Sequence, residues 1–83
     1  MWYVYIAQAK TKRYYVGIAI NPTKRVRDHN SGKGSRFAVI QGPFHLVYVS
    51  PAFLNKSEAR KREIQIKGWS REKKSKLIKG EWK

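Results

Sequence analysis

The sequence predicts a small α+β domain in which a β-hairpin, a third strand and three helices share one core. Two runs near the N-terminus and a third after Gly42-Pro43 are rich in β-branched and aromatic residues, which favour strands. Three helix-opening patterns occur in the remaining sequence. Because a chain of 83 residues can bury only one modest core, we expect a single domain over residues 1–83.

The first two predicted strands, residues 2–8 and 13–18, form a hairpin across a short polar connector. Side chains alternate between the two faces of a strand, so Val4 and the other aliphatic residues separate from Tyr5. The aliphatic face suits a core. Tyr5 and Tyr15 then share the second face, within cross-strand reach of each other. We therefore expect the two phenols to line one surface of the hairpin.

The predicted helices each follow a residue that can cap exposed backbone amides. Asn21 precedes Pro22, which suits a first helical position because it has no amide hydrogen. Asn55 with Glu58 resembles a capping box, and Ser70 can cap the last helix. We expect helices at about 22–30, 56–68 and 71–79, and the third strand at 44–50.

The charge predicts a polyanionic partner. The chain carries 19 Lys and Arg against 5 Asp and Glu, a net charge of +14, and 11 of the basic residues lie within residues 56–83. Such a chain repels itself unless a polyanion accompanies it, and nucleic acid is the natural candidate. We expect DNA, with RNA as the alternative, and poor discrimination between base sequences.

The composition also excludes several kinds of site. The chain has no cysteine, which rules out disulfides, thiolate zinc sites and a thiol nucleophile, and its only histidines are His29 and His45. Any metal ion must therefore be a hard ion on oxygen ligands, such as Mg²⁺ or Mn²⁺. No apolar run reaches the length of about 18 residues that a membrane span needs. We expect a soluble, cytoplasmic protein.

Four of the five acidic residues have ordinary explanations. Glu58 lies in a capping position, and Glu72 lies in the first turn of the last predicted helix, where the helix dipole favours negative charge. Asp28 and Glu81 are expected to be solvated. These four acids require no functional explanation, which leaves one carboxylate to account for.

Glu63 is the exception, because helical spacing puts it on the same stripe as Ala59 and Ile66, facing the sheet. A carboxylate in that position needs a positive partner. One interpretation is a structural salt bridge to Arg25 or Arg62. The other is a single carboxylate that holds Mg²⁺ or Mn²⁺, with water and phosphate oxygens as the remaining ligands.

Arg25 and His29 are four residues apart on the first predicted helix, so they point the same way and could contact a phosphate together. A solvated arginine and a hydrogen-bonded histidine near a helix end are the ordinary alternatives. Tyr5 and Tyr15 have an ordinary alternative too, because tyrosines in strands often serve packing.

Taken together, these residues resemble the GIY-YIG nuclease domain in its small single-domain form, which is itself similar to the N-terminal nuclease of bacterial excision repair. The resemblance covers almost the whole chain, and the order and spacing of its motifs make it specific. The motifs are Tyr3-Val4-Tyr5, Tyr15-Val16-Gly17, Arg25, His29-Asn30-Ser31-Gly32-Lys33-Gly34, and Ser57-Glu58-Ala59 running on to Glu63 and Ile66-Lys67.

The resemblance implies a three-stranded antiparallel sheet flanked by helices, and a role for five residues. Tyr5 matches the tyrosine that acts as the general base or helps to orient it. Tyr15 matches the tyrosine that positions the nucleophile or the phosphate, and Gly17 permits a close backbone approach. Arg25 matches the arginine that stabilises charge on the phosphate, and Glu63 matches the metal-binding glutamate.

The chain departs from the family pattern in a few places. Tyr3 stands where the family name has glycine, and valine replaces the central isoleucine of both tripeptides. The spacing from Glu63 to Ile66-Lys67 is one residue shorter than in the repair nucleases, which leaves Glu58 as an alternative metal ligand.

The sequence thus predicts a divalent-metal-dependent endonuclease that hydrolyses DNA phosphodiester bonds. The alternatives are a non-catalytic DNA- or RNA-binding module and a nuclease that is active only with a partner protein. The basic residues that we expect to contact nucleic acid are Lys33, Arg36, Lys67, Arg71, Lys73 and Lys74.

Overall fold

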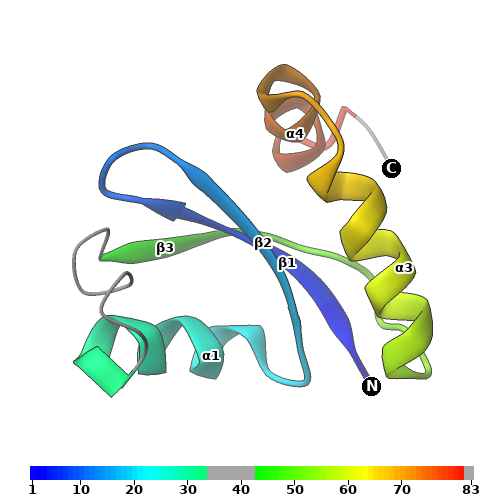
Figure 1. Cartoon of the computed structure of the whole chain (residues 1–83), viewed down its shortest axis with the longest axis horizontal. Helices are drawn as coiled ribbons and strands as arrows, with labels where there is room; N and C mark the ends of the chain where they lie inside the picture. Colours follow the sequence, from blue (N-terminus) through cyan, green and yellow to red (C-terminus); the bar gives the residue numbers. More distant parts are fainter. Residues whose placement is uncertain (34–42, 82–83) are drawn as a thin grey trace.

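A computed structural model of the chain describes residues 1–33 and 43–81 and confirms the predicted α+β class (Figure 1). The three strands form one antiparallel sheet in the order β2-β1-β3. The elements are β1 (Tyr3–Ala9), β2 (Tyr14–Ala19), α1 (Pro22–Asp28), a π-helical segment (His29–Lys33), β3 (Phe44–Val49), α3 (Lys56–Lys67) and α4 (Arg71–Ile78). Most predicted boundaries lie within two residues of these.

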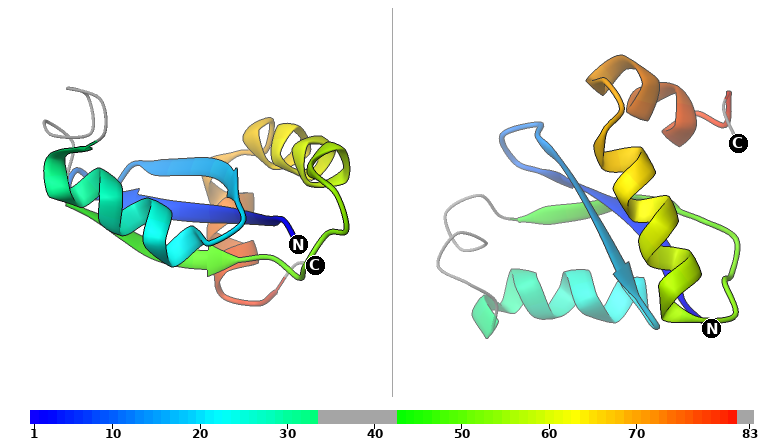
Figure 2. Two further views of the ribbon diagram at one scale, coloured as in Figure 1. Left: turned by 90° about the horizontal axis from the view of Figure 1, so that it is seen from below. Right: turned by 45° about the vertical axis from the view of Figure 1, so that its right-hand side comes forward.

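Helices cover both faces of the sheet, with α1 on one side and α3 and α4 on the other (Figure 2). On the α1 side, Val26 packs with Tyr5 and Phe44. On the opposite side, Val4 and Ile6 pack with residues of α3 and α4. The predicted division of β1 into two sets is therefore confirmed.

Tyr5 and Tyr15 share the second face of the hairpin, as predicted, but this face is covered by α1. Tyr5 is only 9% exposed and Tyr15 is half-buried. The physical reason is that β1 is the central strand and α1 docks against its second face through Val26. The small residues Ala7 and Ala9 on that face let the helix approach closely.

The predicted caps are formed as expected, since the side chains of Asn21, Asn55 and Ser70 each accept a hydrogen bond from a backbone amide three residues on. The first helix is shorter than predicted. It ends at Asp28 and continues as the wider π-helical turn of His29–Lys33. Segments of this kind change the direction in which successive side chains point.

Two side chains tie separate segments to the ends of β3. The Asn30 side chain pairs with the Phe44 backbone, donating to its carbonyl at 2.8 Å and accepting from its amide at 2.7 Å. At the other end, buried Ser50 accepts a hydrogen bond from the Val4 amide at 2.9 Å. These contacts hold β3 against the π-helical segment and β1.

The packing of α4 relies on aromatic residues. Trp69, between α3 and α4, lies against two cations, with the Arg62 guanidinium 5.0 Å and the Lys73 ammonium 4.2 Å from the ring centroid. Nearby, burial raises the pKa of the Tyr48 phenol above its usual value, and the positive charge of Arg62 offsets part of this rise.

In the described part of the chain, no helix has the length and apolar character to cross a membrane.

Candidate active site

Tyr5 lies across the backbone of Gly17. The two residues are cross-strand partners in β1 and β2. A Cβ atom at Gly17 would lie 2.7 Å from the Tyr5 hydroxyl oxygen and 2.8 Å from the ring carbon that bears it, both closer than van der Waals contact allows. Gly17 therefore leaves room for the tyrosine ring of this same chain. Because β2 is an edge strand, the phenol extends from the centre of the sheet toward its edge.

Tyr15 lies on the same face as Tyr5 and pairs with Ala7 in the neighbouring strand. Its ring packs edge-on against Phe44, with the ring centroids 5.2 Å apart and the planes at 85°. The structure thus groups Tyr5, Gly17 and Tyr15 on one face of the hairpin, as the cross-strand argument predicted, and adds α1 above that face.

Arg25 is exposed on α1 and lines a cavity of about 410 Å³ at the end of β2. His29 is not among the residues that line this cavity, and its ring faces Phe44 at a centroid distance of 6.4 Å. The prediction that Arg25 and His29 act together on one phosphate is therefore not supported. His29 still donates its backbone amide to the Arg25 carbonyl, so the difference lies in its side chain, which packs against Phe44. The cavity is lined by Trp2, Ile18, Ala19, Ile20, Asn21, Lys24, Arg25 and Asp28.

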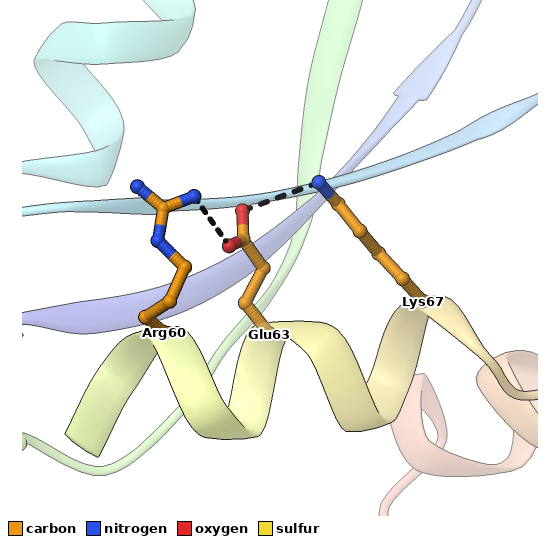
Figure 3. A network of polar contacts seen from close by, with 3 residues as sticks. All are labelled: Arg60, Glu63 and Lys67. Carbon is orange, nitrogen blue, oxygen red and sulfur yellow. Dashed lines mark hydrogen bonds and ion pairs between the residues drawn. The ribbon is translucent and has the colours of Figure 1, made fainter. Parts of the chain in front are cut away.

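Glu63 is a buried carboxylate, 4% exposed, on the face of α3 that packs against the sheet. One of its oxygens, Oε1, lies 3.0 Å from the Arg60 guanidinium, and the other, Oε2, lies 3.5 Å from the Lys67 ammonium (Figure 3). The predicted position of Glu63 is confirmed. The predicted partners, Arg25 and Arg62, are wrong, because residues three before and four after Glu63 on its own helix reach it first.

The two groups of candidate residues approach β2 from opposite faces of the sheet. Tyr5 and Tyr15 lie on the α1 face, whereas Glu63 comes from α3, which packs on the other face and contacts β2. In the described residues, β2 pairs with β1 alone, so its outer edge carries no further strand. The cavity beside Arg25 spans this edge, because Trp2 belongs to the α3-side cluster and Ala19 to the α1-side cluster. The edge of β2 therefore lies between the two groups of candidate residues.

A second cavity, of about 260 Å³, lies at the beginning of β2, beside α4. The Arg71 guanidinium lies 4.3 Å from the centroid of the Tyr14 ring, and the Tyr14 hydroxyl forms a hydrogen bond with Ser75 at 3.0 Å. Three of the lining residues are cationic and none is acidic, which makes this cavity suitable for an anion. It is lined by Arg13, Tyr14, Tyr15, Arg71 and Lys74.

Comparison with known proteins decides the family. The family model described as the GIY-YIG catalytic domain matches residues 1–76. The chain belongs to the GIY-YIG family. It is 46% identical over 76 residues to the UPF0213 protein SSP2268 of Staphylococcus saprophyticus and 42% identical over 76 residues to the UPF0213 protein SH2523 of Staphylococcus haemolyticus. Each alignment covers 92% of both chains.

A solved structure supports the same assignment. The solution NMR structure of the UPF0213 protein BH0048 from Bacillus halodurans matches with a TM-score of 0.59 and 39% sequence identity, covering 95% of this chain and 84% of that one. The predicted resemblance and the predicted fold are thus confirmed, and membership of a GIY-YIG nuclease family makes nucleic acid the expected class of ligand.

The basic residues predicted to contact nucleic acid do not form one cluster in the described part of this GIY-YIG domain; they differ in what their side chains contact. Arg71 and Lys74 line the second cavity. Lys67 forms an ion pair with Glu63, and the Lys73 ammonium packs over the Trp69 ring. Arg36 falls outside the described residues, and only the backbone course of Lys33 is described.

Three residues at these sites were not among the site residues predicted from the sequence. Arg60 pairs with Glu63, and the signal for it was the spacing of three on a helix. Arg13 lines the second cavity, and its place just before β2 was visible in the sequence. Asp28 lines the Arg25 cavity, one helical turn away from Arg25.

Proposed function

We propose that this protein is an endonuclease that hydrolyses phosphodiester bonds of DNA with the help of one divalent metal ion, Mg²⁺ or Mn²⁺. The observation that carries the proposal is Glu63, a buried acid in a strongly basic chain, placed on the sheet-facing side of α3 within a GIY-YIG domain. Burying a carboxylate is costly unless it binds positive charge, which Arg60 and Lys67 supply in this structure and a divalent ion could supply during catalysis.

The Glu63 carboxylate offers two hard oxygen donors, which a divalent ion could use once Arg60 and Lys67 no longer occupy them. Both carboxylate oxygens already have positive groups beside them, at 3.0 Å and 3.5 Å. In the described residues, no cluster of three or more His, Cys, Asp or Glu side chains could hold a metal ion. Glu63 would thus share the ion mainly with non-protein ligands, and Mg²⁺ is commonly held by one or two carboxylates together with water and substrate phosphate oxygens.

The remaining candidate residues suit an in-line displacement at phosphorus. A water oxygen forms a bond to phosphorus while the opposite P–O ester bond breaks, and the leaving oxygen takes up a proton. The hydroxyl of Tyr5, which extends over Gly17, orients the attacking water and its departing proton. The guanidinium of Arg25 donates to the phosphate oxygens as their negative charge grows. A divalent ion held by Glu63 would supply Lewis-acid stabilisation of that charge.

The second cavity supplies a contact for the DNA backbone away from Arg25. Its cations can bind a phosphate through charge-assisted hydrogen bonds, which carry no base sequence information. The two cavities lie at opposite ends of β2, a strand of six residues. At roughly 3.3 Å per residue, a backbone that occupies both would run along the edge of β2 for roughly 17 Å.

Removing two cations from the second cavity should weaken DNA binding and lower its salt dependence. For Arg13→Gln with Lys74→Gln, the slope of log affinity against log salt should decrease by about 0.9 for each phosphate that the cavity no longer binds. The control pair Lys10→Gln with Lys79→Gln removes the same charge from exposed positions outside the cavity. Fluorescence anisotropy with a labelled duplex checks this, and equal slopes for the two pairs would remove the cavity from the DNA path.

Arg25→Ala should slow cleavage more than it weakens binding, because charge on the phosphate builds up mainly in the transition state. We expect single-turnover cleavage to fall by about 10²-fold, with less than a few-fold change in DNA affinity. Lys24→Ala, the neighbour that lines the same cavity, is the matched control. Equal losses of rate and affinity would reassign Arg25 to simple phosphate contact.

Nicking of supercoiled plasmid tests the proposed function. The purified chain should convert supercoiled plasmid to the nicked form in Mg²⁺ or Mn²⁺, and EDTA should stop the reaction. A non-catalytic binding module would instead shift the plasmid on a gel without nicking it at any metal concentration. That second result, with a correctly folded protein, would overturn the proposal.

A further inference from the structure

Glu63 is paired with two cations, Arg60 and Lys67, whose side chains are about half exposed. We propose that Arg60 and Lys67 couple metal binding to DNA binding: without DNA they occupy the Glu63 carboxylate, and DNA phosphates draw them away so that a divalent ion can bind. The inference rests on the proposed function, because it takes Glu63 as the metal ligand. It adds an order to the binding steps and assigns positioning roles to two residues.

The burial of the three side chains is unequal. The Glu63 side chain is 5% exposed, whereas those of Arg60 and Lys67 are 51% and 54% exposed. Figure 3 shows the two cations converging on the carboxylate from either side along α3. The carboxylate is fixed by the packing of the helix, but each cation has solvent on one side and sits at the end of a long, flexible side chain. The cations can therefore move while Glu63 stays in place.

The charges oppose metal binding in the absence of DNA. One carboxylate with two cations leaves a local excess of positive charge, and a divalent ion approaching Oε1 or Oε2 meets repulsion within a few ångströms. Phosphates supply the missing negative charge. Arg and Lys bind phosphate oxygens through charge-assisted hydrogen bonds, so exchanging carboxylate for phosphate costs them little.

The other ion pairs in the described residues are different. Lys61 with Glu58 and Lys76 with Glu72 lie 3.6 Å and 3.7 Å apart, and both of those acids are more than half exposed. Exposed pairs of this kind contribute little and confine neither partner. These two pairs therefore provide a control with the same charge change and the same helical spacing.

The test measures Mn²⁺ binding by titration calorimetry or by the spin-resonance signal of free Mn²⁺. Without DNA, the variant Arg60→Gln with Lys67→Gln should bind Mn²⁺ on the order of tenfold more tightly than the wild type. Adding Glu63→Gln to that variant should remove the gain. The control Lys61→Gln with Lys76→Gln should match the wild type. Melting temperatures of all variants confirm that they are folded.

A second arm uses the unaltered chain. A short duplex should raise the Mn²⁺ affinity of the wild type by a similar factor, and Mn²⁺ should raise its DNA affinity equally, because coupling between two ligands is reciprocal. The same duplex with Glu63→Gln gives the baseline for Mn²⁺ held by the DNA itself. In the Arg60→Gln and Lys67→Gln variant, the coupling should shrink.

The outcomes separate the two proposals. If the wild type without DNA binds Mn²⁺ through Glu63 as tightly as the double variant, and DNA adds nothing, the coupling is overturned and the proposed function stands. If Mn²⁺ binding never depends on Glu63, with or without DNA, the proposed metal site itself is overturned.

Discussion

Glu63→Gln should abolish metal-dependent cleavage while leaving DNA binding intact or slightly stronger. The substitution keeps the size of the side chain but removes the charge that attracts a divalent ion, and it removes one negative charge from a surface that binds phosphates. Single-turnover cleavage of an end-labelled duplex measures the first effect. A gel-shift titration in EDTA measures the second.

The fold should tolerate this change. Arg60 and Lys67 are half-exposed, so neither cation is stranded when Glu63 loses its charge, and glutamine still offers Arg60 an acceptor oxygen. We expect a loss of about 1 kcal/mol in the free energy of unfolding, a few degrees of melting temperature for a domain of this size. If Glu63 has only a structural role, the rate of cleavage per folded molecule should stay unchanged in this variant.

Gly17→Ala should impair both stability and cleavage, because its Cβ would meet the Tyr5 hydroxyl at 2.7 Å and the attached ring carbon at 2.8 Å. The ring is buried beneath α1 and can move only by displacing neighbours. Overpacking of this kind costs about 1–3 kcal/mol. Any displacement also moves the hydroxyl, so cleavage should fall by at least about 10²-fold, as small misplacements in a site often do.

A double variant isolates the steric clash that causes this effect. In a Tyr5→Leu background, the Cβ of Gly17→Ala no longer meets a ring, so the added destabilisation should be smaller than in the wild type. Chemical denaturation of the four proteins gives the coupling energy between the two positions. If the losses in the free energy of unfolding are additive, the β2 backbone requires glycine at position 17 for a reason unrelated to Tyr5. Gly68→Ala, where a Cβ meets nothing closer than 3.5 Å, is the control substitution.

Local signals in the sequence were sufficient for most of the fold. Asn21, Asn55 and Ser70 each cap a helix as predicted, because a capping bond involves residues only three apart. The alternation along β1 likewise separated Val4 from Tyr5, because the pleat of a strand fixes which face each side chain takes.

Features that depend on distant segments were predicted less well. The burial of Tyr5 follows from the docking of α1 on the central strand, which no local pattern encodes. The Asn30 contact with Phe44 joins residues 14 apart and was not anticipated. For Glu63 the sequence indicated the need for a positive partner but not which one, because a chain this rich in lysine and arginine offers several cations near any buried acid.

The most direct test of the metal site at Glu63 is a side-by-side measurement of plasmid nicking by the wild type, Glu63→Gln and Glu58→Gln in Mg²⁺. Glu58 is the other acid considered as a ligand, and the structure pairs it with Lys61 on the exposed side of α3. We expect the wild type and Glu58→Gln to nick at similar rates and Glu63→Gln to be inactive, with all three folded at the assay temperature. Normal nicking by a folded Glu63→Gln protein would contradict the proposed site.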